Sequence, residues 1–303
     1  MLALSTAWYP RSDPRIVPTL RAILAMGFRT VEIGCSKARF RRKKTLAALE
    51  RLGMEVCSVH NVCSERKPAP GNERGDWLAS PHPEQRRAGV EATVESIANA
   101  KALGARAVVL HLGSLPVERS WEKQELLYRL ARHPGAAAQL GVSADEVLAE
   151  RRALAPDYLE AACRSLEELL ERTDGVSLGI ETRMGWHELP SLDELGTLLE
   201  RFPQRRVGYW HDVGHAVLQG AMGLGGQLEW LRRHGPRTLG VHLHDVTAGL
   251  RDHHPPGLGE VDFAPLAERL PPGALRVMEV ASRFIAEELA MGKRRLEEAG
   301  LCD

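Results

Sequence analysis

Short apolar runs alternate with longer amphipathic stretches along almost the whole chain. The apolar runs are five or six residues long and nearly continuous, which is typical of parallel strands covered on both faces. Eight runs are predicted to be strands: Leu2–Ala7, Thr30–Gly34, Glu55–His60, Ala107–His111, Ser177–Glu181, Val207–His211, Leu239–His244 and Arg276–Val280. The stretches between them predict helices at Ile16–Met26, Lys44–Leu52, Glu84–Leu103, Asp157–Arg172, Leu192–Arg201, Gly226–His234, Phe263–Arg269 and Ser282–Glu298.

Eight strands, each followed by a helix, predict an α/β fold of the (β/α)8 TIM barrel type, which needs about 250 residues. Pro156 and Pro190 lie where helices are expected to begin, just before Asp157 and Leu192. No linker-like stretch divides the sequence, so residues 1–303 are expected to form one domain.

The residues in excess of a minimal barrel fall between the fourth strand and its helix, at about 112–156. This segment has helical patterns of its own at Glu122–Ala131, Ala136–Leu140 and Asp145–Leu154. Because it follows a strand, we expect a helical insertion that lies over the catalytic face of the barrel. It would serve as a lid, as a subunit contact in a homo-oligomer, or as decoration without a function.

The charge balance and the cysteines narrow the class of protein. The 303 residues include 40 Lys and Arg against 40 Asp and Glu, so the formal net charge is zero, which makes nucleic acid a less favoured partner than a small molecule. The longest apolar runs are far shorter than the ~20 residues of a membrane helix, so no membrane partner is expected. The sequence shows no secretory leader and its five cysteines include no CxxC pair, and we therefore expect a cytoplasmic protein with reduced thiols.

Histidines and acidic residues gather at the carboxyl ends of the predicted strands. Eight of the twelve histidines lie at or just beyond such an end. In a barrel these ends converge on one mouth, where active sites are built. Four residues there follow consecutive strands and predict a hard, anionic site for Zn²⁺, Mn²⁺, Co²⁺ or Mg²⁺: Glu181, Asp212, His242 and Glu279. Two carboxylates on opposite sides of a substrate could also move a proton between adjacent carbons.

A second set of residues at the same mouth could add ligands. It comprises two residues at strand ends, one residue a helical turn after Asp212, and two in the loop after the seventh strand. These further candidates are His60, His111, His215, Asp252 and His254. His253 competes with His254 for the ligand role, and the spacing does not choose between them. Nine ligands exceed the needs of one ion, so either the extra histidines bind substrate or the centre holds two or three ions.

Four motifs resemble the xylose-isomerase-like TIM-barrel superfamily: IETRMGWHELPS, YWHDVGHA, VHLHDV and DHHPPGLGEVDF. That superfamily contains sugar and sugar-phosphate isomerases and epimerases, inosose dehydratases and endonuclease IV. For the isomerases and epimerases, the resemblance implies one divalent ion held by a Glu, an Asp, a His and a Glu, which match Glu181, Asp212, His242 and Glu279. It further implies that Glu181 and Glu279 are the catalytic acid/base pair across a metal-bound enediolate, and that His215 contacts the substrate.

The endonuclease IV branch implies a larger centre with three zinc ions. The residues that match the ligands added in that branch are His60, His111, His215, Asp252 and His254. Three features depart from that branch, namely His244 in the HLHD motif, the TRMGWHELP loop after the fifth strand, and the neutral net charge.

The loop after Glu181 offers candidate substrate contacts. Arg183 and His187 could hydrogen-bond to a sugar and Trp186 could stack on its ring, or these three side chains could simply pack the loop. The basic run KARFRRKK at 37–44 could bind a substrate phosphate, or it could be an exposed loop. Glu32, in the second strand, is either a further mouth carboxylate or a partner of the basic run.

The sequence favours a divalent-metal-dependent isomerase or epimerase that acts on a sugar, sugar phosphate or cyclitol. Its partner would be a small-molecule carbohydrate, and its cofactor one to three ions of Zn, Mn, Co or Mg. The alternative is a multizinc phosphodiesterase similar to endonuclease IV, in which a hydroxide bridging two ions attacks phosphorus. A non-catalytic metal-binding barrel fits less well, because it would need no acid/base pair such as Glu181 and Glu279.

Overall fold

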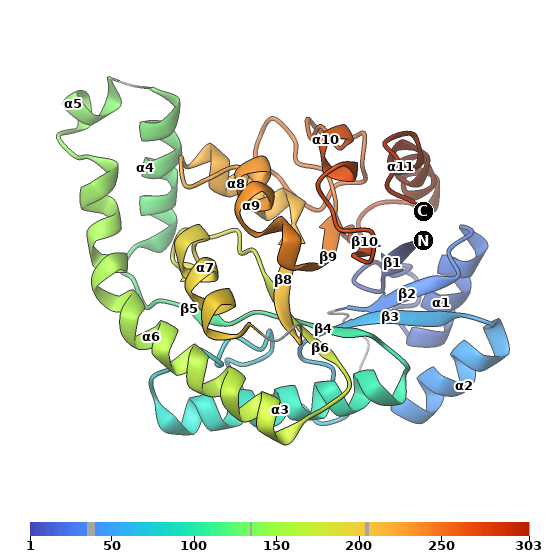
Figure 1. Ribbon diagram of the computed structural model, residues 1–303. Coiled ribbons are helices and arrows are strands. Elements are labelled where there is room, and N and C mark those ends of the chain that lie inside the picture. The colour runs from blue at the N-terminus through green and yellow to red at the C-terminus, as the bar shows by residue number, and fades with distance from the viewer. Residues whose placement is uncertain (35–39, 134, 204–205, 303) are drawn as a thin grey trace.

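Eight parallel strands close into a barrel with helices packed around it (Figure 1). The structure is a computed structural model, and it describes residues 1–34, 40–133, 135–203 and 206–302. The strand order around the barrel is β1-β10-β9-β8-β6-β4-β3-β2. The strands are β1 Leu2–Ser5, β2 Thr30–Ile33, β3 Glu55–His60, β4 Ala107–Leu110, β6 Ser177–Glu181, β8 Val207–Asp212, β9 Thr238–Leu243 and β10 Leu275–Met278. The predicted α/β barrel is confirmed.

Each barrel strand begins and ends within two residues of its predicted position. The agreement follows from burial, because parallel strands covered on both faces must be apolar along nearly their whole length. The strand register pairs Glu181 with Trp210 and Asp212 with His242. The predicted ligands of neighbouring strands therefore end on one rim of the barrel.

The helices that surround the barrel are α1 Ile16–Ala25, α2 Arg42–Leu52, α3 Pro83–Ala102, α6 Ala144–Arg172, α7 Leu192–Arg201, α8 Val213–Ala221, α9 Gln227–His234, α10 Ala264–Ala267 and α11 Ala286–Glu298, with a short 3-10 helix at Gly235–Arg237. Helix α8 is not among the predicted helices. Strand β8 ends at Asp212 and α8 begins at Val213, so no loop in the sequence separates this mostly buried helix from the apolar strand before it. Within the described parts of the chain, no helix has the length and apolar character needed to cross a membrane.

Pro156 lies inside helix α6 and does not begin a helix, contrary to the prediction. The helix starts twelve residues earlier at Ala144, where Ser143 and Glu146 form a reciprocal capping box. The two predicted helices at 145–154 and 157–172 are thus one helix of 29 residues. Its second half buries Leu166 and Leu169, and this packing outweighs the cost of an internal proline.

The insertion at 112–156 contains β5 Gly113–Ser114, α4 Ser120–Arg132, α5 Ala136–Leu140 and the first part of α6. Figure 1 shows α4, α5 and the start of α6 at one edge of the molecule. Strand β5 pairs with β7 Glu188–Leu189, in the loop that follows β6. The Arg151 side chain, from α6, donates to the carbonyl of Trp186 at 2.7 Å and to both carboxylate oxygens of Glu194. The insertion is therefore fastened to the loop after β6.

The inside of the barrel is filled by the indole of Trp210. It packs in a buried cluster with Ala3, Cys57, Ala107, Val109, Leu275 and Val277. A Cβ atom at Gly240 would lie 2.4 Å from this indole, and one at Gly179 would lie 2.9 Å from it. The His242 ring meets the indole edge to face, with ring centroids 5.2 Å apart. Trp210 thus forms the floor beneath His242.

Replacing Gly240 with Ala should destabilise the protein, because the new methyl group would overlap the indole of Trp210. Overpacking of this kind costs about 1–3 kcal/mol of unfolding free energy. The matched control is Gly273→Ala, where an added Cβ meets no heavy atom within 4 Å. Urea unfolding monitored by circular dichroism measures both variants, and equal midpoints would contradict the close approach at Gly240.

Candidate metal centre

Four side chains from neighbouring strands converge at the mouth of the barrel. Glu181 ends β6, Asp212 ends β8, His242 lies in β9 and Glu279 directly follows β10. All four are buried, and their ligand atoms lie within 4.8 Å of one another. We call this set the four-ligand group. The structure therefore brings together the residues from which the sequence predicts a single-ion site.

One imidazole nitrogen faces all three carboxylates of the four-ligand group. Nδ1 of His242 lies 2.8 Å from Oε1 of Glu181 and 3.0 Å from Oε2 of Glu279. Its distance to Oδ2 of Asp212 is 3.5 Å. That Oδ2 atom is fully buried and accepts no hydrogen bond from any residue that the structure describes. A buried carboxylate oxygen without a partner is costly, and a cation in the centre of the group would remove that cost.

The electrostatics of the group also favour a cation. Burial would raise the pKa of Glu181, but the adjacent histidines His111, His242 and His60 outweigh burial and lower this pKa well below its usual value. Burial likewise would lower the pKa of His242, but Glu279 and Glu32 outweigh it and raise that pKa well above its usual value. In this structure a protonated imidazole balances part of the carboxylate charge. A divalent ion could take over that balance.

Glu32 holds the far side of the His242 ring. Both of its carboxylate oxygens lie 3.2 Å from Nε2 of His242, and Ser58 donates to one of them at 2.8 Å. A proton on Nε2 that faces Glu32 leaves Nδ1 as the ligand atom, which is how carboxylates commonly orient metal-binding histidines. Of the two roles considered for Glu32, the structure shows a mouth carboxylate. Residues 37–39 of the basic run lie outside the described residues.

A second group of ligand-like atoms comprises His60, His111 and Glu181. Oε2 of Glu181 lies 2.6 Å from Nε2 of His111 and 3.7 Å from Nε2 of His60. Arg183 enters the same group, with Nη1 in contact with Nε2 of His111 and 2.9 Å from Oε2 of Glu181. Its guanidinium is therefore buried behind the four-ligand group and is not free to bind a substrate at the mouth.

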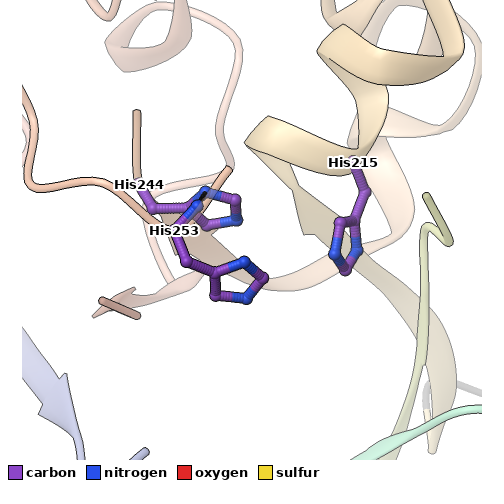
Figure 2. Close-up of side chains that lie close together, drawn as sticks. All are labelled: His215, His244 and His253. Carbon is purple, nitrogen blue, oxygen red and sulfur yellow. Dashed lines mark hydrogen bonds between the residues drawn. The ribbon is translucent and has the colours of Figure 1, made fainter. Parts of the chain in front are cut away.

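The third group comprises His215, His244 and His253. Figure 2 shows the rings of His244 and His253 lying over one another, with His215 reaching from the first turn of α8. The stacked centroids are 4.2 Å apart, and the ring of His215 lies 5.6 Å from that of His253. Oδ2 of Asp252 lies 3.1 Å from Nδ1 of His253 and 3.8 Å from Nε2 of His215. Two predicted ligands, His215 and Asp252, thus meet here together with His253, the alternative to His254.

His253, and not His254, faces His215 and Asp252. The ring of His254 packs edge to face on Phe284, with centroids 4.9 Å apart, and its Nδ1 lies 3.0 Å from the carbonyl oxygen of Asp252. The backbone of His253 has φ of 54°, a left-handed conformation that few residues other than glycine adopt. His253, the alternative to His254 in the sequence, is therefore the candidate ligand in the third group.

His244 supports the centre through both ring nitrogens. Its Nδ1 accepts the backbone N–H of His253 at 2.9 Å, so Nε2 carries the proton and donates to Oδ1 of Asp212 at 2.9 Å. Both nitrogens are therefore engaged, and the ring positions Asp212. A Cβ at Gly214 would lie 2.0 Å from this ring. The sequence could have indicated that His244 lies near the ligands, because it follows His242 by two residues and alternate residues of a strand share one face.

Asp245 organises the loop that carries Asp252 and His253. Its buried carboxylate accepts four backbone N–H groups, from Val246, Gly257, Gly259 and Val261, at 2.8–2.9 Å. A Cβ at Gly259 would lie 2.3 Å from Oδ1 of Asp245, so glycine is needed there. The loop is in effect wrapped around one carboxylate.

Trp186 and His187 lie beside the insertion. The Trp186 side chain is 1% exposed, and its indole N–H donates to the carbonyl of Ser120 at 2.9 Å. Its buried position leaves no indole face for the sugar stacking that the sequence suggests. The ring of His187 lies 5.9 Å from that of Trp186, and burial lowers the pKa of His187. Trp186 therefore packs the loop after β6 against the insertion, and the partly buried His187 lies beside it.

The chain matches a known family over most of its length. Residues 20–272 match the family model described as xylose isomerase-like TIM barrel, and the protein belongs to that family. The chain is 31% identical over 221 residues to the uncharacterized protein y4fM of Sinorhizobium fredii (strain NBRC 101917 / NGR234). The match covers 70% of this chain and 60% of that protein, so the chain spans about 60% of the length of this relative.

Solved structures share the fold at low sequence identity. A D-tagatose 3-epimerase-like protein is 18% identical with a TM-score of 0.69, over 98% of this chain and 96% of that chain. The apo form of 3-keto-D-glucoside 4-epimerase, YcjR, from E. coli is 14% identical with a TM-score of 0.66, over 98% of both chains. The IOLI protein with a zinc atom is 12% identical with a TM-score of 0.67, over 99% of this chain and 97% of that chain. At these identities the likeness shows the fold.

Replacing Asp245 with Asn should loosen the loop at 252–261, because an amide nitrogen cannot accept the N–H groups that one carboxylate oxygen now accepts. Leaving such buried donors unpaired costs about 1–3 kcal/mol each. The expected result is faster hydrogen–deuterium exchange in peptides that cover this loop, measured by mass spectrometry. Glu260→Gln, an exposed change in the same loop, is the control and should leave exchange unchanged. Equal exchange in both variants would show that Asp245 does not fix the loop.

Proposed function

We propose that the protein is a divalent-metal-dependent isomerase or epimerase that acts on a sugar, a sugar phosphate or a cyclitol. The observation that carries this proposal is the four-ligand group, three buried carboxylates around one imidazole nitrogen, with one carboxylate oxygen that lacks a partner among the described residues. The fold is shared with proteins whose names are those of sugar epimerases, which supports a carbohydrate substrate.

The residues of the four-ligand group fit a hard divalent cation such as Mn²⁺, Co²⁺, Mg²⁺ or Zn²⁺. Glu181, Asp212 and Glu279 would supply oxygens, and His242 would supply Nδ1. When bound, such an ion supplies a Lewis acid that polarises a substrate carbonyl and stabilises negative charge on its oxygen. The chain itself fixes the ligands, through Glu32 behind His242 and His244 behind Asp212.

Glu181 and Glu279 are the candidate acid/base pair. Oε1 of Glu181 lies 2.8 Å from Nδ1 of His242, and Oε2 of Glu279 lies 3.0 Å from the same nitrogen. Both carboxylates therefore reach the centre of the group. One would remove the proton from the carbon next to the carbonyl, and the other would return a proton to that carbon or its neighbour. Two carboxylates in reach of one substrate carbon are what epimerisation requires.

His215 is suited to hold a substrate hydroxyl. Its Nδ1 lies 2.9 Å from the carbonyl oxygen of Thr182, so Nδ1 carries the proton and Nε2 keeps its lone pair. Burial lowers the pKa of His215, which keeps the ring neutral. A neutral Nε2 near Asp252 would accept a hydrogen bond from a sugar hydroxyl.

Replacing Glu279 with Gln should abolish the incorporation of solvent deuterium into substrate carbon, because the amide cannot take up a proton. The loss should be at least about 10²-fold. Proton NMR in D₂O with ketoses and ketose phosphates provides the measurement. Glu260→Gln, an exposed carboxylate outside the three ligand groups, is the matched control. Metal content is measured on the same samples, and exchange that persists in Glu279→Gln with the metal retained would remove Glu279 from the base role.

A second function is favoured by the number of ligand-like residues. Three groups of donor atoms lie at one mouth, which is the composition of a multizinc phosphodiesterase similar to endonuclease IV. Two or three zinc ions per chain in purified protein, together with cleavage of phosphodiesters or abasic DNA, would support that function. In that case the double variant Asp252→Asn, His253→Ala should lose the cleavage. One ion per chain without phosphodiester cleavage would support the isomerase.

A further inference from the structure

We infer that the guanidinium of Arg183 is the permanent cation of the second group, so that His60, His111 and Glu181 bind no metal ion in the native chain. Arg183 is in contact with Nε2 of His111, and its Nη1 lies 2.9 Å from Oε2 of Glu181. Its side chain is 4% exposed, so the charge lies inside the protein and not at the rim of the mouth. This inference uses the metal centre proposed above but not the reaction proposed for it.

The guanidinium is held from its other edge as well. Nε and Nη2 of Arg183 donate to Oε1 of Glu188 at 3.1 and 2.7 Å. The other oxygen of Glu188 accepts the backbone N–H of Gly185 at 2.7 Å. Gln219 donates to the backbone carbonyl of Arg183 at 2.9 Å. The planar fork thus bridges two carboxylates, and moving it away would leave both without their cation.

The ring nitrogen that His111 would offer to a metal ion is already in contact with two other groups. Nε2 of His111 faces Oε2 of Glu181 at 2.6 Å and also touches Nη1 of Arg183. An ion bound at Nε2 would have to displace the guanidinium from this contact.

Charge repulsion excludes an ion more generally. Arginine keeps its proton at all pH values at which proteins fold, and a divalent cation among these ligand atoms would lie within a few ångströms of the guanidinium. In a buried environment two such positive charges repel strongly. The two oxygens of Glu181 therefore have different partners. Oε2 pairs with Arg183, and Oε1 faces His242 in the four-ligand group.

The consequence concerns the kind of chemistry that the mouth supports. A hydroxide that bridges two ions needs a second ion beside the first, and a guanidinium supplies charge without a coordination site. Arg183 therefore leaves the mouth with the single ion position of the four-ligand group. One ion position suits a hydroxy-carbonyl substrate, whereas the two-ion attack on a phosphodiester needs a second.

Zinc stoichiometry tests the inference. Purified holoprotein is equilibrated with Zn²⁺, freed of excess metal by gel filtration, and analysed by inductively coupled plasma mass spectrometry. Replacing His111 with Ala in the otherwise native chain should leave the zinc content unchanged. The charge-balanced variant Arg183→Ser, Glu188→Gln should gain one zinc ion per chain, and adding His111→Ala should remove that gain. Arg152→Ser, an exposed arginine of the insertion, is the control and should gain none.

Two outcomes would overturn the inference. Loss of one zinc ion in His111→Ala alone would show that the second group binds metal in the native chain. Failure of folded Arg183→Ser, Glu188→Gln protein to gain a His111-dependent ion would show that the arginine does not occupy a metal position. If that variant does not fold, the native-background His111→Ala result decides. Asp212→Asn tests the four-ligand group separately. Loss of zinc in that variant supports the proposed metal centre, whereas unchanged zinc would contradict the proposed function without deciding the inference about Arg183.

Discussion

Glu181, Asp212 and Glu279 bring three carboxylates into a volume from which solvent is nearly absent, and the rest of the mouth is arranged around that negative charge. Charged groups are stable in such surroundings only when they are paired and hydrogen-bonded. His242 faces all three, Arg183 pairs with one oxygen of Glu181, and His244 holds one oxygen of Asp212. The oxygen that remains is where a cation fits.

The residues that position the side chains around these carboxylates come from distant parts of the chain. Asp245 gathers the backbone of the loop after β9 and so determines where His253 lies. On the opposite side, Arg151 of the insertion holds the loop after β6, in which Glu188 fixes Arg183. The insertion is thus linked through hydrogen bonds to the side chain that shares Glu181. A segment that looks like an addition to the barrel contributes to the geometry of the mouth.

The barrel and the four-ligand group could be predicted from the sequence because both depend on local rules. Buried parallel strands are apolar runs, and residues at the ends of such runs must share one rim. Helix α8 could not be predicted in this way, since it follows β8 without a loop and its buried residues continue the apolar run of the strand. The choice between His253 and His254 depends on one left-handed residue, and spacing carries no information about φ.

The positions of Arg183 and Trp186 could not be read from the sequence for a different reason. Both follow Glu181 by only a few residues, so both were expected at the mouth. Trp186 is instead drawn to the insertion by a hydrogen bond to Ser120, and Arg183 is drawn inward by Glu188. Such contacts depend on long-range packing or on the path of the loop, and the hydrophobic periodicity of the sequence contains no information about either.

The indole of Trp210 and the two glycines beside it have a consequence for how this barrel can change. A smaller residue at position 210 alone would leave a cavity in the barrel, and a side chain at 240 or 179 alone would overlap the ring. Changes at these three positions are therefore coupled, and the effect of one depends on which residues occupy the other two. Since the His242 ring rests on the same indole, such compensation inside the barrel would also be felt at the ligands above it. For this reason, substitutions in the barrel interior and substitutions at the rim are not expected to have independent effects.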